Sequence, residues 1–311
     1  MEAITWRRAT LTDTAGIVAV HCSHVETWRR DGRGEPVPYD SLTLYERWLH
    51  GGPWMSTETC AIHLSRVLDA GWSVLVAQQG DEIVGEAEFL ENAEPSPYGP
   101  TFHLSLLFVH AAHQQRGVGR ALLEAGERLA RERGCAALTT QPERPAEPFY
   151  RRAGFAPWLW LREWQARARE QPLLGEPEAL PHALYPADEP LVLRAGRYQC
   201  GRQAWDDLPF RMPFPEHTAL RWGRWRLALP GGAVWLGLRS QPLEPSQADG
   251  FIWTRPGADL PPAIAALQTL AARMGFTAVD MLLEEPEGHE LAATLGFEHQ
   301  TDLMMWRKEI P

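Results

Sequence analysis

Apolar positions along the chain follow two spacings, one typical of helices and one typical of strands. Residues 121–133 and 263–274 place apolar side chains at every third or fourth position, and each run ends at a glycine, Gly134 or Gly275. Apolar runs of strand length precede and follow these helices. The predicted strands are 74–77, 83–89, 136–140, 225–229, 233–238 and 278–283. This mixture predicts an α/β protein.

Further helices are predicted before the first of these strands. Thr10 and Asp13 have the spacing of a capping box in front of an apolar run, which marks a helix start. Helices over 42–50 and 58–69 are predicted from the glycines that follow each of them. We therefore predict three helices before the strand at 74–77.

The two halves of the chain repeat the same order of elements. In each half a hairpin with a glycine turn precedes the long helix, and a Gly-Phe pair, 154–155 or 296–297, follows the next strand. The glycine that ends the helix lies 20 residues before the glycine of this pair in the first half and 21 in the second. One fold used twice explains the match, and chance similarity of short segments is the alternative.

A proline-rich stretch separates the two halves. Between residues 171 and 190 the chain has five prolines and little apolar periodicity, which is typical of a linker. The length of 311 residues also suits two domains. We therefore predict domains at 1–165 and 191–311, joined by a linker at 166–190.

The charged residues exclude several functions. The net charge is −10, and Lys308 is the one lysine among the thirty basic residues. Because no glycine-rich loop precedes Lys308, the chain lacks the lysine that a Walker A loop, a protein kinase or a pyridoxal enzyme requires. An acidic chain is also poorly suited to nucleic acid, whereas it attracts cationic partners such as amines.

The cysteines and the apolar runs give no sign of a metal site, of export or of a membrane segment. No two of the four cysteines form a CxxC pair, and no apolar run approaches the length needed to span a bilayer. We expect a cytoplasmic protein without a metal. The cysteines are Cys22, Cys60, Cys135 and Cys200.

A glycine-containing turn carries the main chemical signal. Residues 104–123 read as an apolar strand, a polar turn with Gly117 and Gly119, and an amphipathic helix. Such a turn lets the backbone approach a ligand, and the unpaired N–H groups at the helix start attract negative charge. A pyrophosphate suits this site. A helix that starts after glycine for packing reasons alone is the alternative.

Three motifs in this half resemble the GNAT superfamily of N-acetyltransferases. Residues 114–119 match its Q/R-x-x-G-x-G/A signature, and the L-x-V strand precedes them at 107–109. Residues 146–155 resemble the family's A-x-x-F-Y-x-x-x-G-F signature, and 8–13 look like its usual first helix. The resemblance extends over about 165 residues. With the internal repeat, it implies two tandem GNAT-like domains, each a mixed, mostly antiparallel sheet flanked by helices.

The resemblance implies an acetyl-CoA-dependent N-acetyltransferase that acts on a primary amine of a small molecule or peptide. Pyrophosphate would lie on the turn, and pantetheine would lie along the strand that ends at Val109. A non-catalytic acyl-CoA-binding sensor or scaffold is the alternative, and the chain could be a monomer or a homodimer. The implied cofactor-binding residues are Phe108, Val109, Gln114, Gln115, Arg116, Gly117, Val118, Gly119, Arg120 and Ala121.

Attack of an amine on a thioester needs a base, an N–H that faces the carbonyl oxygen, and an acid for the leaving thiolate. The resemblance assigns the N–H to the backbone near Val109 and the acid to Tyr150, which could instead be a core tyrosine. Many relatives have a glutamate as base where this chain has His103, so the base is in doubt. Glu86 and Glu88, which alternate on one strand, are the other candidates, unless they form a solvated strand face.

The second half has lost these chemical groups. Aligning Gly134 with Gly275 places Ala258 and Leu260 at the positions of the two turn glycines, and Pro261 follows at the helix start. The other replacements are Ala292 for Tyr150, Leu238 for Glu86 and Ser240 for Glu88. We therefore predict a non-catalytic copy that serves as a scaffold or as one wall of the acceptor site.

Overall fold

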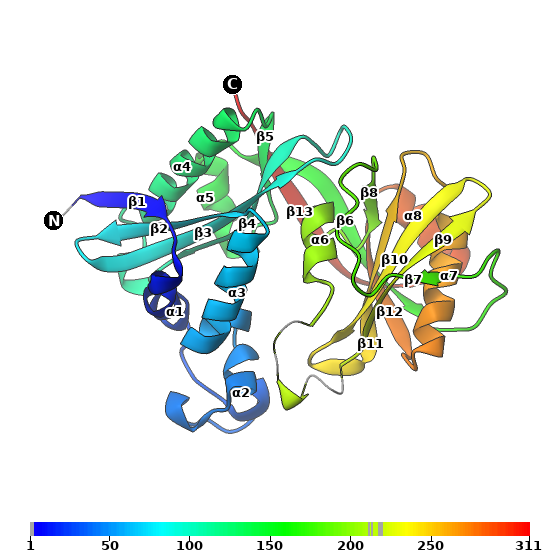
Figure 1. Cartoon of the computed structure of the whole chain (residues 1–311), viewed down its shortest axis with the longest axis horizontal. Helices are drawn as coiled ribbons and strands as arrows, with labels where there is room; N and C mark the ends of the chain where they lie inside the picture. Colours follow the sequence, from blue (N-terminus) through cyan, green and yellow to red (C-terminus); the bar gives the residue numbers. More distant parts are fainter. Residues whose placement is uncertain (1–2, 211, 213, 217–219) are drawn as a thin grey trace.

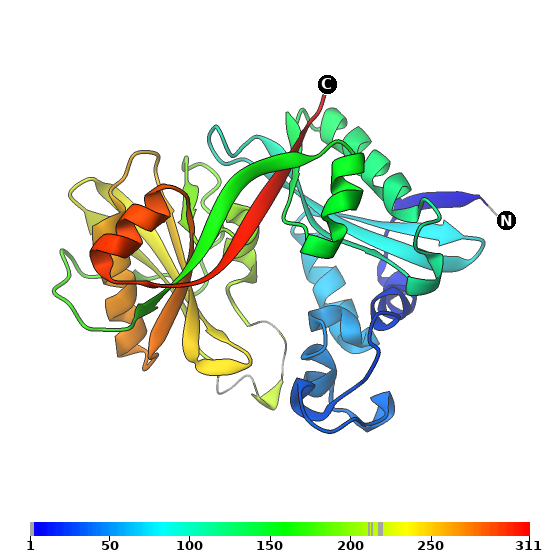
Figure 2. The ribbon, with the colours of Figure 1, turned by 180° about the vertical axis from the view of Figure 1, so that it is seen from behind.

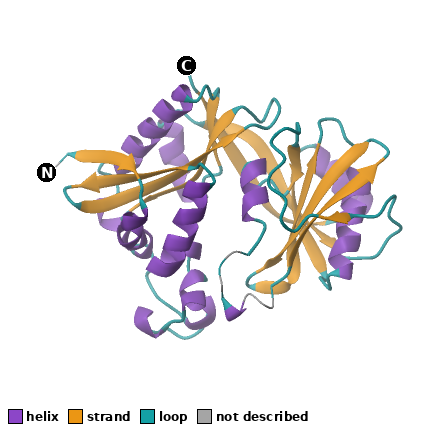
Figure 3. Ribbon diagram, viewed as in Figure 1, coloured by secondary structure: helices purple, strands orange, loops and turns teal. Residues whose placement is uncertain are grey.

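Two lobes share one continuous sheet in the computed structural model, which describes residues 3–210, 212, 214–216 and 220–311 (Figure 1). Over these residues the sheet has thirteen strands in the order β1-β2-β3-β4-β5-β13-β6-β12-β8-β11-β10-β9-β7. Helices cover both faces of the first lobe's sheet (Figure 3). No helix in the described part of the chain has the length and apolarity to cross a membrane.

The first lobe contains the strands β1 (Ile4–Arg8), β2 (Ser73–Gln79), β3 (Glu82–Asn92), β4 (Thr101–Val109), β5 (Ala137–Thr140) and β6 (Ala156–Arg167). Its helices are α1 (Thr14–Cys22), α2 (Leu44–Trp48), α3 (Thr57–Asp69), α4 (Val118–Glu132) and α5 (Glu147–Arg152). Successive side chains of β2 point to opposite faces of the sheet, and helices cover both faces. Leu75 and Ala77 pack in the core under α4, whereas Val74 and Val76 pack in the core under α1 and α3.

The second lobe contains the strands β7 (Glu178–Ala179), β8 (Val192–Ala195), β9 (Trp222–Leu229), β10 (Gly232–Gln241), β11 (Glu244–Thr254), β12 (Ala278–Glu284) and β13 (Glu298–Glu309). Its helices are α6 (Gly201–Asp207), α7 (Leu260–Arg273) and α8 (Glu287–Leu295). Side chains of α7 form the main core of this lobe with β10, β11 and β12.

The predicted repeat and fold class are confirmed. The order β2-β3-β4-α4-β5-α5-β6 recurs as β9-β10-β11-α7-β12-α8-β13. In each series the first strand pairs with the second and the second with the third, both antiparallel, and the third pairs with the fourth in parallel. Gly134 and Gly275 both adopt positive φ, at 69° and 78°, which explains why each helix ends there.

The last strand of each series completes the sheet of both lobes. Strand β13 lies between β5 and β6, and β6 lies between β13 and β12. Figure 2 shows the two strands side by side as they cross from one lobe to the other. Trp306 of β13 is 1% exposed and belongs to the core of the first lobe. The boundaries at 165 and 190 remain predictions, because the exchanged strands leave no border in the sheet itself.

Two predicted segments differ from the structure. The helix expected over 42–50 is limited to α2, because Thr43 and Glu46 form the capping box that sets its start. The predicted linker includes β7, which pairs with β9. Strand β8 and helix α6, just beyond the linker, are additional elements of the second lobe.

Candidate active site

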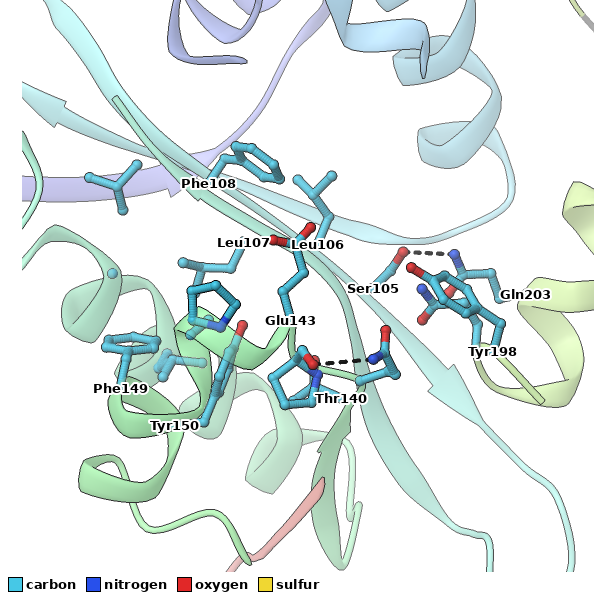
Figure 4. Close-up of a pocket in the computed structure, with 18 of the residues that line it drawn as sticks. Ser105, Leu106, Leu107, Phe108, Thr140, Glu143, Phe149, Tyr150, Tyr198 and Gln203 are labelled. Atoms are coloured by element: carbon cyan, nitrogen blue, oxygen red, sulfur yellow. Dashed lines mark hydrogen bonds between the residues drawn. The ribbon is translucent and has the colours of Figure 1, made fainter. Parts of the chain in front are cut away.

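A large cavity begins where β4 and β5 separate. The two strands pair along Thr101–His103 and Ala137–Thr139, and no strand in the described residues pairs with the remainder of β4 on that edge. The cavity that opens beside it has a volume of about 1630 Å³ and is lined by both lobes. Figure 4 shows Ser105, Leu106 and Leu107 of β4 at its edge. The free backbone groups of this edge can pair with an extended ligand.

The turn before α4 forms one end of the cavity. Gly117 caps the helix with φ at 89°, a conformation that residues with a side chain rarely adopt. Gly119 packs closely, since a Cβ there would lie 3.2 Å from the Phe149 ring. The first N–H groups of α4 lack partners within the helix and carry the positive end of its dipole. This end of the cavity is therefore suited to a phosphate group.

Tyr150 lies in the cavity wall opposite the free edge of β4. Its side chain is 6% exposed, and burial raises the pKa of its phenol to about 12, against the effect of a hydrogen bond with Thr140. The phenol is therefore protonated at neutral pH. Tyr150 and Glu143 both extend toward the space next to Leu106 and Leu107 (Figure 4). This placement allows Tyr150 to donate a proton to a group bound along β4.

His103 lies behind the cavity wall, on β4. It is fully buried, and its ring nitrogens lie 3.0 Å from Thr139 Oγ1 and 2.5 Å from Gln199 Oε1. Burial lowers the pKa of His103 to about 4, so the ring is neutral at neutral pH. Gln199 itself lines the cavity. A hydrogen bond to Gln199 therefore links His103 to the cavity.

Glu86 and Glu88 are buried on β3 and are outside the cavity lining. Each is 1% exposed and pairs with a histidine, Glu86 with His21 Nε2 at 2.7 Å and Glu88 with His63 Nε2 at 2.8 Å. Burial, followed by the neighbouring Glu88, raises the pKa of Glu86, and burial lowers the pKa of His21 to about 3. These carboxyls form an interior network, not the solvated strand face that was the alternative.

The structure brings most of the predicted cofactor residues together. Phe108, Val109, Gln114, Gln115, Gly117, Val118, Gly119 and Arg120 line the cavity. Arg116 is exposed, and neither it nor Ala121 is among the described residues that line it. The described residues also contain no group of three or more His, Cys, Asp or Glu arranged to hold a metal ion.

Several cavity residues were not predicted to belong to the site from the sequence. Glu143 follows β5, and its sequence context has no motif. Most of the others lie after the predicted linker, where only tertiary structure brings them to β4. They are Tyr198, Gln199, Gln203, Asp207, Arg239, Asp249, Asp280 and Lys308, together with Glu163 of β6.

Residues 34–155 match the profile of the acetyltransferase (GNAT) family. No curated protein sequence matches the chain significantly.

Solved structures resemble the chain over nearly its whole length. A GCN5-related N-acetyltransferase from Anabaena variabilis is 11% identical, with a TM-score of 0.64, over 99% of this chain and 73% of that one. A GCN5-related N-acetyltransferase from Kribbella flavida is also 11% identical, with a TM-score of 0.57, over 98% of this chain and 71% of that one. At this identity the likeness establishes the fold of both lobes.

Proposed function

We propose, from the match of residues 34–155 to the acetyltransferase (GNAT) family, that the chain transfers an acetyl group from acetyl-CoA to a primary amine. The observation that carries the proposal is the free edge of β4, which leads directly to the glycine turn and the start of α4. An extended donor with a pyrophosphate fits this arrangement in shape and in charge. The acceptor would be a small molecule or a peptide.

The residues present fit the donor along its length. The N–H and C=O groups of 104–109 would pair with the amides of pantetheine, and the first N–H groups of α4 would bind the pyrophosphate. Acetyl-CoA would supply the thioester. An N–H near Val109 would face the carbonyl oxygen, where negative charge develops as the amine attacks. Tyr150 would give its proton to the departing thiolate.

We assign the removal of the amine proton to Glu143, with His103 in a supporting role. Glu143 is exposed, lines the cavity and is close enough to raise the pKa of both Tyr150 and Tyr198, although burial is the larger cause in each. His103 would hold Gln199 in the wall. His103, Glu86 and Glu88 remain candidate bases, and each would need the wall to open before it met the amine.

A thiol-release assay with acetyl-CoA and a panel of primary amines tests the proposal. We expect thiol release that depends on the amine and that falls in Glu143→Gln, with Glu147→Gln, a neighbouring carboxylate outside the cavity, as the control. Calorimetric binding of acetyl-CoA without release for any amine would favour the alternative, an acyl-CoA-binding sensor or scaffold. A protein that does not bind acetyl-CoA would contradict both.

A further inference from the structure

The part of the cavity wall that β6 and the second lobe form is acidic. It includes Glu163 of β6, Asp280 of β12, Asp249 of β11 and Asp207 at the end of α6. Asp249 and Asp280 are direct partners in the parallel pairing of β11 and β12, and β6 is the next strand after β12. We call the surface formed by Glu163, Asp249 and Asp280 the acidic wall.

Two of these four carboxylates form an ion pair with an arginine, and the other two have no cationic partner among the described residues. Asp207 pairs with Arg66 at 2.8 Å, and Asp249 pairs with Arg239 at 3.1 Å.

Within the described part of the chain, the side chain of Asp280 accepts hydrogen bonds from two neutral amides, Gln165 at 2.9 Å and Gln241 at 2.6 Å, and pairs with no cation. The side chain of Glu163 forms no hydrogen bond or ion pair with another described residue. Burial raises its pKa, and the charges of Asp280 and Asp249 raise it further. The acidic wall therefore has uncompensated negative charge that a bound cation would neutralise.

Gln203 of α6 points independently to a ligand that donates hydrogen bonds. Its side chain lines the cavity and is 6% exposed. The side-chain nitrogen donates to Ser105 Oγ at 2.7 Å and to Asp207 Oδ2 at 3.2 Å, which fixes the orientation of the amide. The other amide atom, Oε1, is buried and has no hydrogen-bond partner among the described residues. A buried carbonyl oxygen of this kind is costly unless a donor approaches it.

The same contacts connect Gln203 to the strand that we assign to donor binding. Ser105 belongs to β4, the strand assigned to the donor, and the amide of Gln203 reaches it directly, as Figure 4 shows. An amine that meets the thioester beside β4 would therefore pass Gln203, and the remainder of the molecule would extend toward the acidic wall.

We propose that the acidic wall selects amine acceptors that have a second cationic group, such as diamines, polyamines and amino-guanidines. Gln203 Oε1 would accept from an N–H of the acceptor, and Glu163 with Asp280 would bind the distal cation. This inference rests on the proposed acetyl transfer and adds its substrate class. The same carboxylates would repel an acceptor that has an anionic end.

Three primary amines of equal length test the substrate class. 1,4-Diaminobutane, 4-amino-1-butanol and 4-aminobutanoate present a cationic, a neutral and an anionic distal group. We expect kcat/KM to fall in that order, by about tenfold or more between the first and the last, since hydrogen bonds to charged groups are among the stronger ones. Equal values for the three, or the reverse order, would overturn the inference and leave acetyl transfer intact.

Variants identify the residues that bind the distal cation. Glu163→Gln and Asp280→Asn preserve side-chain shape, and we expect each to raise the KM for 1,4-diaminobutane roughly tenfold while the KM for 4-amino-1-butanol and for acetyl-CoA stays unchanged. Glu298→Gln on β13, an exposed carboxylate outside the cavity, is the matched control. Equal effects on the diamine and the amino alcohol would contradict the assignment.

Direct binding separates failure of this inference from failure of the proposed function. Calorimetry of the CoA-saturated full chain with 1,4-diaminobutane should show binding that Asp280→Asn weakens. Binding without turnover would support the acidic wall and contradict acetyl transfer. An absence of both binding and turnover with the diamine would overturn the inference.

Discussion

In both lobes the third and fourth strands of the repeated series separate, but the space between them is filled differently. In the first lobe β4 and β5 separate around the cavity, whereas in the second lobe β8 lies between their counterparts, β11 and β12. Ala195 of β8 pairs with Ile252 of β11 and with Leu283 of β12. The backbone edge that is free for a ligand in one lobe is therefore satisfied by the chain itself in the other.

The helix starts show the same contrast, with a correction to the sequence alignment. Gly117 is the cap of α4, and the residue in the same place before α7 is Asp259, not Ala258. Counting from the caps, Pro261 and not Leu260 corresponds to Gly119. A carboxylate repels phosphate and proline has no N–H to offer, so the second lobe departs further from an anion site than the alignment indicated.

The position of the predicted acid is equivalent in the two lobes. The carbonyl of Tyr150 accepts from Phe155 N, and the carbonyl of Ala292 accepts from Phe297 N in the same type of turn. The comparison teaches that the fold alone does not make a site. An open strand edge, a helix start with free N–H groups and a few side chains distinguish the two lobes.

The largest effect should come from separating the lobes. A fragment of residues 1–169 lacks β13, so β5 and β6 lose the strand that joins them, and the core loses Trp306. We expect the fragment to aggregate and to show no cooperative thermal unfolding, as measured by size-exclusion chromatography and calorimetry.

Co-expression with residues 170–311 is the control and should restore a soluble complex. A monomeric fragment with full activity would show that the second lobe is dispensable, and the comparison would then concern two independent domains.

Removal of the Tyr150 hydroxyl should have the second largest effect, a slower acetyl transfer. Tyr150→Phe should lower kcat by about 10²- to 10⁴-fold with little change in the KM for acetyl-CoA, because general acid help acts late in the reaction. Tyr185→Phe, at a packed tyrosine of the second lobe, is the matched control. If steady-state rates of Tyr150→Phe equal those of the unaltered protein, Tyr150 has only a packing role.

Cofactor binding should be confined to the first lobe. Gly119→Val should weaken the binding of CoA tenfold or more, about 1.4 kcal/mol, because the added Cβ would clash with Phe149 beside the helix start. Ala258→Val in the second lobe should have no effect. Calorimetry should give one site per chain, and two equivalent sites would show that β8 does not exclude the ligand.

Acid should destabilise the first lobe through His103. The folded pKa of about 4 lies below the ordinary 6.5, so between these values the unfolded chain binds more protons, and stability falls as the pH falls. We expect a loss of up to about 1.4 kcal/mol per pH unit from this residue, measured by urea unfolding at pH 7.5, 6.5 and 5.5.

His103→Gln should make this pH dependence shallower by up to one proton, and an unchanged slope would contradict the assignment. His21 is less suitable for the test, because the raised pKa of its partner Glu86 acts in the opposite direction.

The sequence by itself determined the local elements, the repeat and the cofactor motif. These depend on interactions within a few residues, such as the spacing of apolar side chains, the glycine that ends each helix and the turn at Gly117. Tyr150 was predicted as the acid in another way, from the resemblance of residues 146–155 to a family signature, and its role remains a prediction. The predicted bases were less certain, because the burial of His103, Glu86 and Glu88 depends on helices distant in the sequence.

Only the tertiary structure decided the exchange of β6 and β13, the insertion of β8 between β11 and β12, and the composition of the acidic wall. Backbone pairing is the same for any strand of suitable composition, so the sequence does not specify which partner a strand takes across a hundred residues or more. Glu163, Asp249 and Asp280 meet because three strands from distant segments become neighbours in one sheet.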